Sequence, residues 1–259
     1  MMKNYVISLT TANDRRTHIC QEFGKQGIDF EFFDAVTPNQ LVETAQSLKI
    51  DLNKNQLLSN NELACLLSHI SLWKKAIDEN MDYIAIFEDD IYLSKDAHLF
   101  LNHSDWIKND WGFIKIEKTI EKALLKNPTP LQENHTISLL NSVHLATGGY
   151  ILSKTIAQQL YHHFLSLNNI GHIDQFLFKT VLEENIAPIY QINPVLCIQD
   201  CILYPDNQKF LSSLEWRDSI KNNKASPPLH KKIVREFQRL LKQIYDYIFF
   251  TKMRLIFKR

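Results

Sequence analysis

The sequence predicts an α/β protein in which a mostly parallel sheet is flanked by helices. Short apolar segments, typical of buried strands, alternate with longer segments in which apolar residues recur at helical spacing. The chain has 259 residues, of which 45% are hydrophobic and 22% charged, as in ordinary globular domains. Three consecutive acids end one apolar segment, and ligands of such sheets bind beyond the carboxyl ends of the strands.

The predicted strands and helices alternate along the chain. Ser59 and Glu62 form a capping box, and leucines recur at helical spacing in the segment that follows. Ser153 caps a second long helix, which runs to about Leu167. The predicted strands are Tyr5–Leu9, Phe30–Phe33, Tyr83–Phe87, Trp111–Ile116, Tyr150–Leu152, Ala187–Ile192 and Val195–Ile198. The other predicted helices begin at Arg15 and span Asp174–Glu184.

The C-terminal region differs from the rest of the chain in charge. Residues 230–259 hold nine Lys or Arg against two Asp or Glu, so the remainder carries a formal charge of −7 against a total of zero. Pro227-Pro228 marks a linker. We therefore predict a catalytic domain over residues 1–220, followed by a linker and a basic amphipathic helical tail over residues 221–259. Such a helix either packs on the domain or binds an anionic membrane surface, and we favour the second.

Composition also limits the compartment and the partners. The four cysteines lack zinc-site spacing and are typical of a reducing environment. The N-terminal segment has no signal-peptide pattern, and no stretch of about 18 apolar residues occurs. The excess of positive over negative charge is confined to the tail, which argues against a nucleic-acid-binding domain. We expect a cytoplasmic protein, peripheral at the inner face of the inner membrane.

The most informative segment is the apolar strand Tyr83–Phe87, which runs directly into Glu88, Asp89 and Asp90. Three carboxylates at the end of a buried strand repel one another and resist desolvation. A solvated acidic loop is one interpretation, but a divalent cation would offset this cost, and Mg²⁺ and Mn²⁺ prefer oxygen ligands. Such a cation could neutralise a diphosphate leaving group, with Asp90 as its direct ligand. Asp89 and Glu88 would then face a ribose and a transferred sugar.

Six motifs fall in order over about residues 4–200. They are Tyr5-Val-Ile-Ser-Leu9 with Arg15-Arg16, Phe30-Glu-Phe-Phe-Asp-Ala35, Glu62-Leu-Ala-Cys-Leu-Leu-Ser-His-Ile-Ser-Leu-Trp73, Phe87-Glu-Asp-Asp90, Gly148-Gly-Tyr-Ile-Leu-Ser153 and Ile173-Asp-Gln-Phe-Leu177. Together they resemble glycosyltransferase family 25. This family includes bacterial lipooligosaccharide galactosyl- and glucosyltransferases and procollagen galactosyltransferases.

The resemblance implies a GT-A fold with a Rossmann-like sheet, a UDP-sugar donor, Mn²⁺ or Mg²⁺ as cofactor, and inversion to a β-linkage. It makes Glu88-Asp89-Asp90 the counterpart of the Asp-x-Asp motif. The uridine and ribose would be held by Ser8, Leu9, Arg15, Arg16, Asp34 and Ala35, with Ser68 and His69 near the donor. Gly148, Gly149 and Tyr150 would contact the acceptor. Gly149 departs from the family pattern, because many relatives have a bulkier residue there, often His.

Glycosyl transfer also needs a base for the acceptor hydroxyl, since a metal-bound carboxylate is a weakened base. Asp174, at the start of a predicted helix, is our candidate, although an N-cap role would also explain it. Glu117, after a predicted strand, is a second acid that could reach the acceptor. Gln199 and His172 are candidate metal or phosphate contacts. His69 could be either a packed helical histidine or a functional one.

These observations together predict a metal-dependent, inverting glycosyltransferase that moves galactose or glucose from a UDP-sugar to a lipooligosaccharide core. Two other classes remain open at this stage. A metal-dependent phosphodiesterase or nucleotidyl-transfer enzyme would also use clustered carboxylates. A non-catalytic UDP-sugar-binding protein would bind the donor and release no product. The sequence does not distinguish galactose from glucose, because the orientation of one hydroxyl is read by pocket geometry.

Overall fold

The computed structural model describes residues 2–210 and 248–259. The strands are β1 (Met2–Ser8), β2 (Glu31–Asp34), β3 (Tyr83–Glu88), β4 (Ile91–Leu93), β5 (Phe113–Lys115), β6 (Lys122–Pro130), β7 (Thr136–Leu140), β8 (Gly149–Ser153), β9 (Tyr190–Asn193), β10 (Cys197–Gln199) and β11 (Thr251–Arg254). The helices are α1 (Asn13–Gly24), α2 (Leu41–Ser47), α3 (Asn60–Asp78), α4 (His98–Leu101), α5 (Lys154–Ser166), α6 (Ile173–Gln175), α7 (Val181–Glu183) and α8 (Asp200–Leu203). Short 3₁₀ turns span Pro38–Gln40 and Leu52–Lys54, and a π turn spans Phe176–Thr180.

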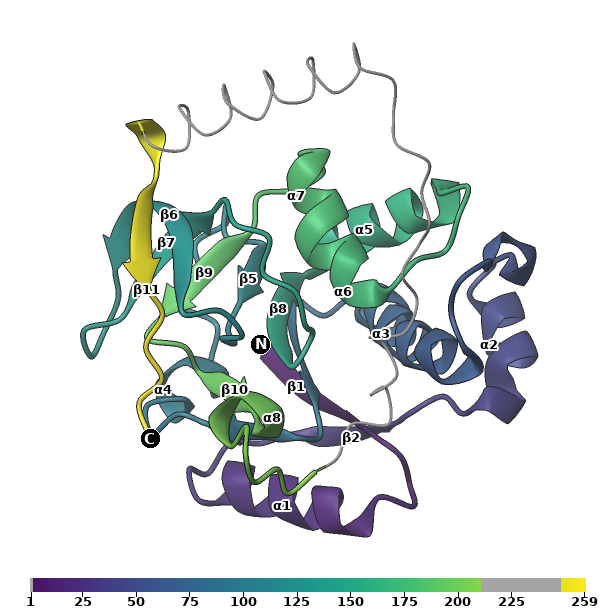
Figure 1. Ribbon diagram of the computed structural model, residues 1–259, viewed down its shortest axis with the longest axis horizontal. Helices are drawn as coiled ribbons and strands as arrows, with labels where there is room; N and C mark the ends of the chain where they lie inside the picture. The colour runs from purple at the N-terminus through teal and green to yellow at the C-terminus, as the bar shows by residue number, and fades with distance from the viewer. Residues whose placement is uncertain (1, 211–247) are drawn as a thin grey trace.

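The described residues form a nine-stranded sheet in the order β11-β6-β7-β9-β5-β8-β3-β1-β2 (Figure 1). β1 pairs in parallel with β2 and β3, and β5 pairs in parallel with β9, while the other neighbours are antiparallel. Following these pairings across the sheet, β1, β2, β3, β5, β6 and β9 run in one direction and β7, β8 and β11 in the other. The predicted α/β class and predominantly one-directional sheet are confirmed.

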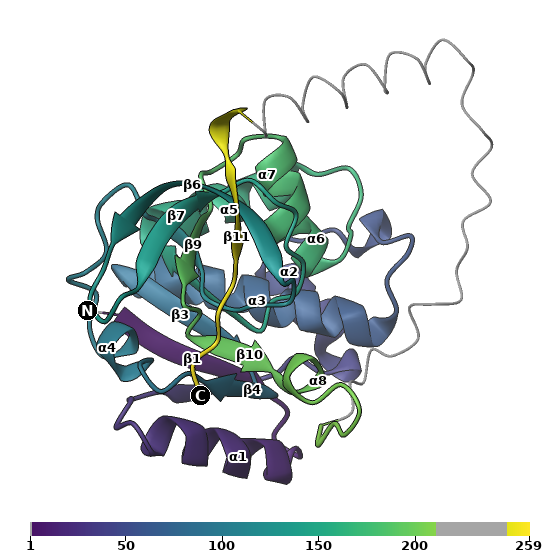
Figure 2. The ribbon, with the colours of Figure 1, turned by 60° about the vertical axis from the view of Figure 1, so that its left-hand side comes forward.

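Alternating side chains of the strands divide the core into two layers. On one face, Ile84 and Ile86 of β3 pack with α2, α3 and α5 around the fully buried Trp73. On the other face, Ala85 and Phe87 pack with α1 and α4. Figure 2 shows α1 and α3 on opposite sides of the β1–β3 region. Helices cover both faces of these strands, so side chains on both faces are buried. This explains why the strand sequences are continuously apolar instead of alternating between apolar and polar residues.

A separate two-stranded antiparallel ribbon pairs β4 with β10 and places Gln199 opposite Ile91. The backbone N–H of Asp200 also donates to the carbonyl of Asp90 at 2.8 Å. This ribbon explains how a residue at position 199 reaches the acids that follow β3. A chain segment more than one hundred residues downstream is fixed beside them by its register.

The C-terminal residues extend the central sheet. β11 pairs antiparallel with β6, and Leu255 is fully buried in the core. The predicted boundary at residue 220 and most of the predicted amphipathic helix lie outside the described residues. The prediction of a helical tail is wrong for Thr251–Arg254, which pair with β6 as a strand. Within the described ranges, no helix is both long enough and apolar enough to cross a bilayer.

Candidate active site

Two cavities meet at the acids that follow β3. The first, here called the β1 cavity, has a volume of about 360 Å³ and is lined by the end of β1, the start of α1, the loop after β2 and one side of α3. The second, the α6 cavity, has a volume of about 240 Å³ and is lined by α3, α6, the loop before β8 and the end of β10. Cys65, Glu88 and Asp90 line both cavities. A ligand that fills both would therefore pass directly over the two carboxylates.

Asp89 is neutralised by its own protein surroundings. Its Oδ1 accepts from Arg15 Nη1 at 2.6 Å, and its Oδ2 accepts from Ser8 Oγ at 2.6 Å. These contacts follow from the parallel pairing of β1 with β3, which places Ile7 opposite Glu88 and so brings Ser8 beside Asp89. Both Asp89 oxygens therefore accept hydrogen bonds that join β1 and α1 to the end of β3. Asp89 thus has a structural role in addition to the predicted contact with ribose.

Asp90 has much less compensation for its charge. Arg15 Nη1 lies 4.0 Å from its carboxylate, and Gln199 Nε2 donates to it at 3.3 Å. Burial and the negative charge of Glu88 raise the pKa of Asp90 from 3.8 to about 7. A buried carboxylate with oxygen-bearing neighbours and surplus negative charge fits a hard divalent cation such as Mg²⁺ or Mn²⁺. Gln199 presents its amide nitrogen to the carboxylates and acts there as a hydrogen-bond donor.

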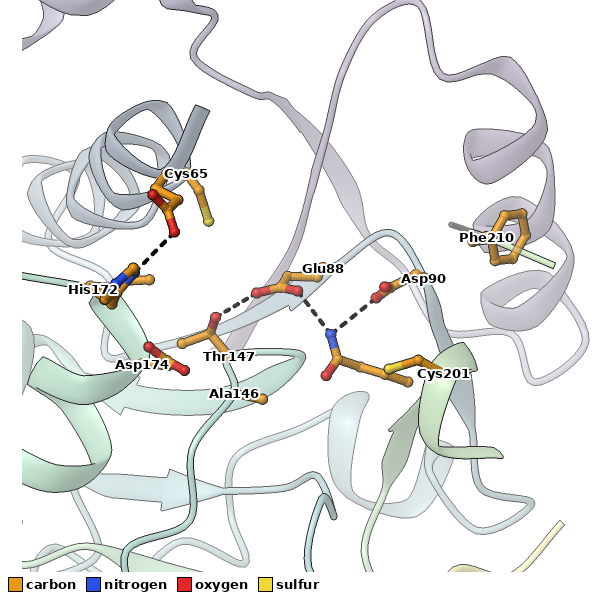
Figure 3. A pocket seen from close by; sticks show the side chains of 12 residues that line it. Cys65, Glu88, Asp90, Ala146, Thr147, His172, Asp174, Cys201 and Phe210 are labelled. Carbon is orange, nitrogen blue, oxygen red and sulfur yellow. Dashed lines mark hydrogen bonds and ion pairs between the residues drawn. The ribbon is translucent and has the colours of Figure 1, made fainter. Parts of the chain in front are cut away.

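Glu88 lies at the centre of the site in Figure 3, between Thr147 and Asp90. Thr147 Oγ1 donates to Glu88 Oε1 at 2.5 Å, and Gln199 Nε2 donates to Glu88 Oε2 at 2.9 Å. Burial opposes ionisation of Glu88, but His69 and Thr147 outweigh it and lower the pKa of this carboxyl. Gln199 bridges Glu88 and Asp90, so the two acids form one unit with unequal affinities for a proton.

Asp174 lies in α6 with its side chain in the α6 cavity (Figure 3). The N-cap of α6 is His172, so Asp174 is an interior residue of this short helix and the N-cap explanation is wrong. Asp174 is 6% exposed, and its Oδ1 accepts from the Gln175 backbone N–H at 2.8 Å. His172 lines the same cavity and its Nδ1 lies 3.4 Å from Glu62 Oε1.

Glu117 is buried outside both cavities and pairs with a buried lysine. Its Oε1 accepts from Lys115 Nζ at 2.8 Å, and both side chains are fully buried. Burial lowers the pKa of Lys115 and raises that of Glu117, although the opposite charge of each partner counteracts the shift. Lys115 Nζ also donates to the carbonyl of Ala146 at 2.7 Å. Because Ala146 has a φ of +80°, this bond holds an unfavourable backbone conformation directly before Thr147.

The three residues of the Gly-Gly-Tyr segment have different surroundings. A Cβ at Gly148 would lie 2.6 Å from Glu117 Oε2, so the loop can approach the acid only without a side chain here. A Cβ at Gly149 would collide with Cys197 Sγ, so a bulkier residue at this position requires a different neighbour. Tyr150 is fully buried, and its hydroxyl contacts His69 and Trp73. Its side chain lies in the core and lines neither cavity.

The remaining predicted donor residues gather at the end of β1. Arg16 Nη2 donates to Asp34 Oδ1 at 2.5 Å and to the Ser8 carbonyl at 2.9 Å, so it joins the ends of β1 and β2. Leu9 and Ala35 line the β1 cavity. Ser68 also lines it, and its Oγ accepts from the Val36 N–H at 2.9 Å. Arg16 and Ser68 thus shape the cavity through hydrogen bonds within the protein.

Three residues outside the predicted site have defined positions in or beneath it. Thr147 donates to Glu88, Cys65 lines both cavities, and Lys115 supports the loop before Thr147. The sequence contains a signal for Lys115, because Lys115 and Glu117 are two residues apart at the end of an apolar strand and so share one face if the backbone stays extended. Thr147 and Cys65 have no such signal, because ordinary residues of these types occur in any turn or helix.

Comparison with known proteins identifies the family of the chain. The sequence model of glycosyltransferase family 25, described as an LPS biosynthesis protein family, matches residues 1–188. The lacto-N-neotetraose biosynthesis glycosyltransferase LgtE of Neisseria meningitidis is 37% identical over 256 residues, covering 95% of this chain and 87% of that protein. The lipooligosaccharide biosynthesis protein lic2B of Haemophilus influenzae is 32% identical over 262 residues, covering 96% and 97%.

Among solved structures, a glycosyltransferase involved in glycosylation of the major capsid of PBCV-1 is similar at a TM-score of 0.43 and 9% identity, covering 77% of this chain and 92% of that chain. The extent of the family match, together with relatives above 30% identity over most of their length, excludes the two rival classes left open by the acid cluster alone. The chain belongs to glycosyltransferase family 25, and it is a glycosyltransferase with a sugar donor and a saccharide acceptor.

Proposed function

We propose that this chain transfers galactose or glucose from a UDP-sugar to a lipooligosaccharide core, with inversion to a β-linkage. The observation that carries the proposal is the meeting of two cavities at Glu88 and Asp90. A donor nucleotide occupies the β1 cavity and a sugar acceptor the α6 cavity, so the bond to be broken lies over the acids. The names of the relatives LgtE and lic2B support a lipooligosaccharide acceptor.

The nucleotide fits the β1 cavity because the ends of two parallel strands provide its walls. Leu9 and Ala35 supply apolar and backbone surface for uridine and ribose, and Arg15 supplies positive charge at the cavity floor. Arg15 is held within reach of the diphosphate by its ion pair with Asp89. The pairing also limits rotation of the guanidinium, which lowers the entropy lost on binding.

Asp90 would hold a divalent cation. Gln199 turns its amide nitrogen toward the carboxylates, so it would join as a second ligand only after rotation of the amide brings its oxygen to the cation. When bound, Mg²⁺ or Mn²⁺ supplies positive charge that stabilises the departing diphosphate. The cation would also compensate the burial of Asp90, whose pKa is raised to about 7 without it. Glu88, kept ionised by His69 and Thr147, accepts hydrogen bonds from hydroxyls of the transferred sugar.

Asp174 takes the proton of the attacking acceptor hydroxyl. Its carboxylate lies in the α6 cavity, on a helix whose start is fixed by the packing of Ile173. Attack by the hydroxyl oxygen on the anomeric carbon and departure of UDP occur in one displacement, which inverts that carbon. Asp174 is separated from Asp90 by Glu88 and Thr147 in Figure 3, so base and cation ligand are different groups.

Calorimetric titration tests the donor half of this proposal. UDP, UDP-galactose and UDP-glucose are titrated with and without Mn²⁺ into the wild type, Asp90→Asn and the matched control Asp105→Asn, which changes an exposed aspartate. We expect Mn²⁺-dependent binding in the wild type and control, and at least tenfold weaker binding in Asp90→Asn. The relative affinities rank the two sugars. Absence of uridine-nucleotide binding in every condition would refute the donor assignment.

Product analysis tests the acceptor and the stereochemistry. Incubation with the preferred UDP-sugar and lipooligosaccharide oligosaccharides should give a product whose anomeric proton coupling reports a β-linkage. An α-linked product would contradict the single displacement. Hydrolysis of the donor without transfer to any of these acceptors would contradict the acceptor class.

We also propose that the basic tail associates with anionic membrane at the cytoplasmic face, where a lipid-linked acceptor would be presented. Truncation is a poor test, because β11 belongs to the sheet. Reversal of charge at Lys231, Lys232 and Arg235 leaves β11 in place. Co-sedimentation with vesicles containing anionic lipid should fall in this variant, and unchanged binding would remove the tail from the proposal.

A further inference from the structure

A second group of metal-ligating side chains lies beside Asp90 and has a different chemistry. Cys65 and His69 are one helical turn apart on α3 and therefore lie on the same face. Glu88 comes to the same point from the end of β3. One ligand atom from each of these three residues lies within 4.8 Å of the other two. The function proposed above assigns no role to Cys65 and uses His69 only through its proximity to Glu88.

The His69 ring is already oriented for ligation. His69 is fully buried, and its Nδ1 lies 2.9 Å from the Tyr150 hydroxyl. That hydroxyl is fixed in turn by Trp73 Nε1, which donates to it at 3.0 Å. A histidine ligand is commonly positioned in this way through its second nitrogen.

The other nitrogen, His69 Nε2, is buried and has no hydrogen-bond partner. It lies 3.7 Å from Glu88 Oε1, which is beyond hydrogen-bonding distance. A buried polar atom without a partner carries a desolvation cost, so its environment is incomplete as it stands. A cation between Cys65, His69 and Glu88 would complete it.

We infer that Cys65, His69 and Glu88 bind a thiophilic divalent cation, with Zn²⁺ as the best match. Sulfur, imidazole nitrogen and carboxylate oxygen form a ligand set that Zn²⁺ prefers and that Mg²⁺ does not. Three protein ligands leave a fourth tetrahedral position, and Cys65 and Glu88 both line the cavities, so this position is open to water or ligand. The site is separate from the all-oxygen position at Asp90 and shares only the Glu88 region with it.

Occupation of this site has a consequence for the reaction. Zn²⁺ would compete for Glu88, whose oxygens accept from Thr147 and Gln199. The cation would therefore alter the point at which the two cavities meet. We expect Zn²⁺ to inhibit transfer in the presence of Mn²⁺, and Cys65→Ser to relieve this inhibition.

The inference is tested on the full chain without nucleotide, so it does not depend on the proposed donor or acceptor. Co²⁺ is added as a spectroscopic substitute, and Zn²⁺ affinity is measured by calorimetry. The variants are Cys65→Ser and His69→Gln. The controls are Cys201→Ser, which changes another thiol in the α6 cavity, and Cys20→Ser, which changes an exposed thiol. Circular dichroism and thermal unfolding verify that each variant is folded.

We expect one Zn²⁺ per chain at this site and a thiolate-to-Co²⁺ charge-transfer band. The band should disappear in Cys65→Ser, and Zn²⁺ affinity should fall at least tenfold in Cys65→Ser and in His69→Gln, while both controls keep the wild-type values. Wild-type protein without the band, or folded Cys65→Ser with unchanged Zn²⁺ affinity, would overturn the inference. Loss of the band in Cys201→Ser instead would assign the thiolate to a different residue and also overturn it.

Discussion

The ends of β3 and β5 both carry charged residues, but their charges are arranged in opposite ways. After β3, Glu88 and Asp90 line both cavities, and Arg15, which lies 4.0 Å from Asp90, is already paired with Asp89. At the end of β5, Glu117 has its counterion, Lys115, at 2.8 Å and is sealed from solvent. The first group is left with surplus negative charge, whereas the second is neutral as a pair.

We interpret the acids after β3 as a binding site and the Lys115–Glu117 pair as a structural support for the loop beside it. A buried group with surplus charge destabilises the folded protein when no ligand is bound, and binding of a cation there stabilises the folded protein. A neutral buried pair gains nothing from a ligand, and it holds the backbone, here through the bond from Lys115 to the strained Ala146. Removing a charge should therefore stabilise the protein at β3 and destabilise it at β5.

The largest expected effect comes from the residue that faces the acceptor. Asp174→Asn should lower kcat by about 10²–10⁴-fold with little change in the KM for the donor, because it removes the base and keeps the shape. The matched variant Glu117→Gln changes a buried carboxyl outside the cavities. Steady-state kinetics on both should show a kcat defect in Asp174→Asn that exceeds the defect in folded Glu117→Gln. Wild-type kcat in Asp174→Asn would eliminate it as the base.

The support is tested by breaking the buried pair. Lys115→Met leaves Glu117 buried without its counterion and should lower the free energy of unfolding by about 3–5 kcal/mol. Replacing both partners, as in Lys115→Met with Glu117→Leu, should recover most of this loss. Lys74→Met, which breaks an exposed pair with Asp78, should cost less than about 1 kcal/mol. Urea denaturation measures the free energy of unfolding of all three variants. Equal decreases for Lys115→Met and Lys74→Met would show that the buried pair is no more important for stability than an exposed one.

A smaller effect of opposite sign is expected at Asp90. Because its pKa is raised above its unfolded value, its contribution to stability is full below about pH 4 and is lost as pH rises through about 7. In chelator at pH 8, Asp90→Asn should therefore be more stable than the wild type by about 2 kcal/mol, while it loses Mn²⁺-dependent activity. Denaturation at pH 5 and pH 8 checks this, and a destabilised Asp90→Asn at pH 8 would refute it.

The smallest effect is the pH dependence of cation affinity. Mn²⁺ must displace the proton of Asp90, whose pKa of about 7 reflects burial and the charges of Glu88 and Asp89 against that of Arg15. Affinity should fall about tenfold between pH 8 and pH 6, because the ionised fraction falls by that factor. Calorimetric titration of Mn²⁺ at both values measures it. A flat profile would mean that Asp90 is already ionised without the cation.

Local patterns were sufficient for much of the fold. The capping box at Ser59 and Glu62 forms as predicted, and Ser153 caps α5 through the N–H of Ile156. The hairpin of β6 and β7 was not predicted. Its first strand contains Asn127 and Pro128 within the sequence Lys122–Pro130, and such residues favour turns over strands. The strand accommodates them because they lie at a break in the register between β6 and β7, beyond the residues of β6 that pair with β11.

Site residues at the ends of strands could be predicted from the sequence. Residues whose positions depend on which strands pair, and in which register, could not. The acids after β3, the end of β1 and the start of the loop after β2 come together around one cavity, as expected for the carboxyl ends of parallel strands. The position of Tyr150 was not deducible, because its distance from the cavities depends on which side of β8 faces α3. Likewise, only the pairing of β10 with β4 brings Gln199 to Glu88. These contacts are set by long-range packing, which local sequence does not encode.

The pairing of β11 with β6 has a consequence for how the chain reaches its native state. It joins Thr251 to Leu125, and this large separation in sequence makes the contact slow to form. Until β11 arrives, β6 is an unpaired edge that another copy could extend, which is a route to aggregation. Variants that end before β11 should therefore accumulate as insoluble protein for reasons unrelated to catalysis, and soluble yield is the quantity to follow in any shortened form.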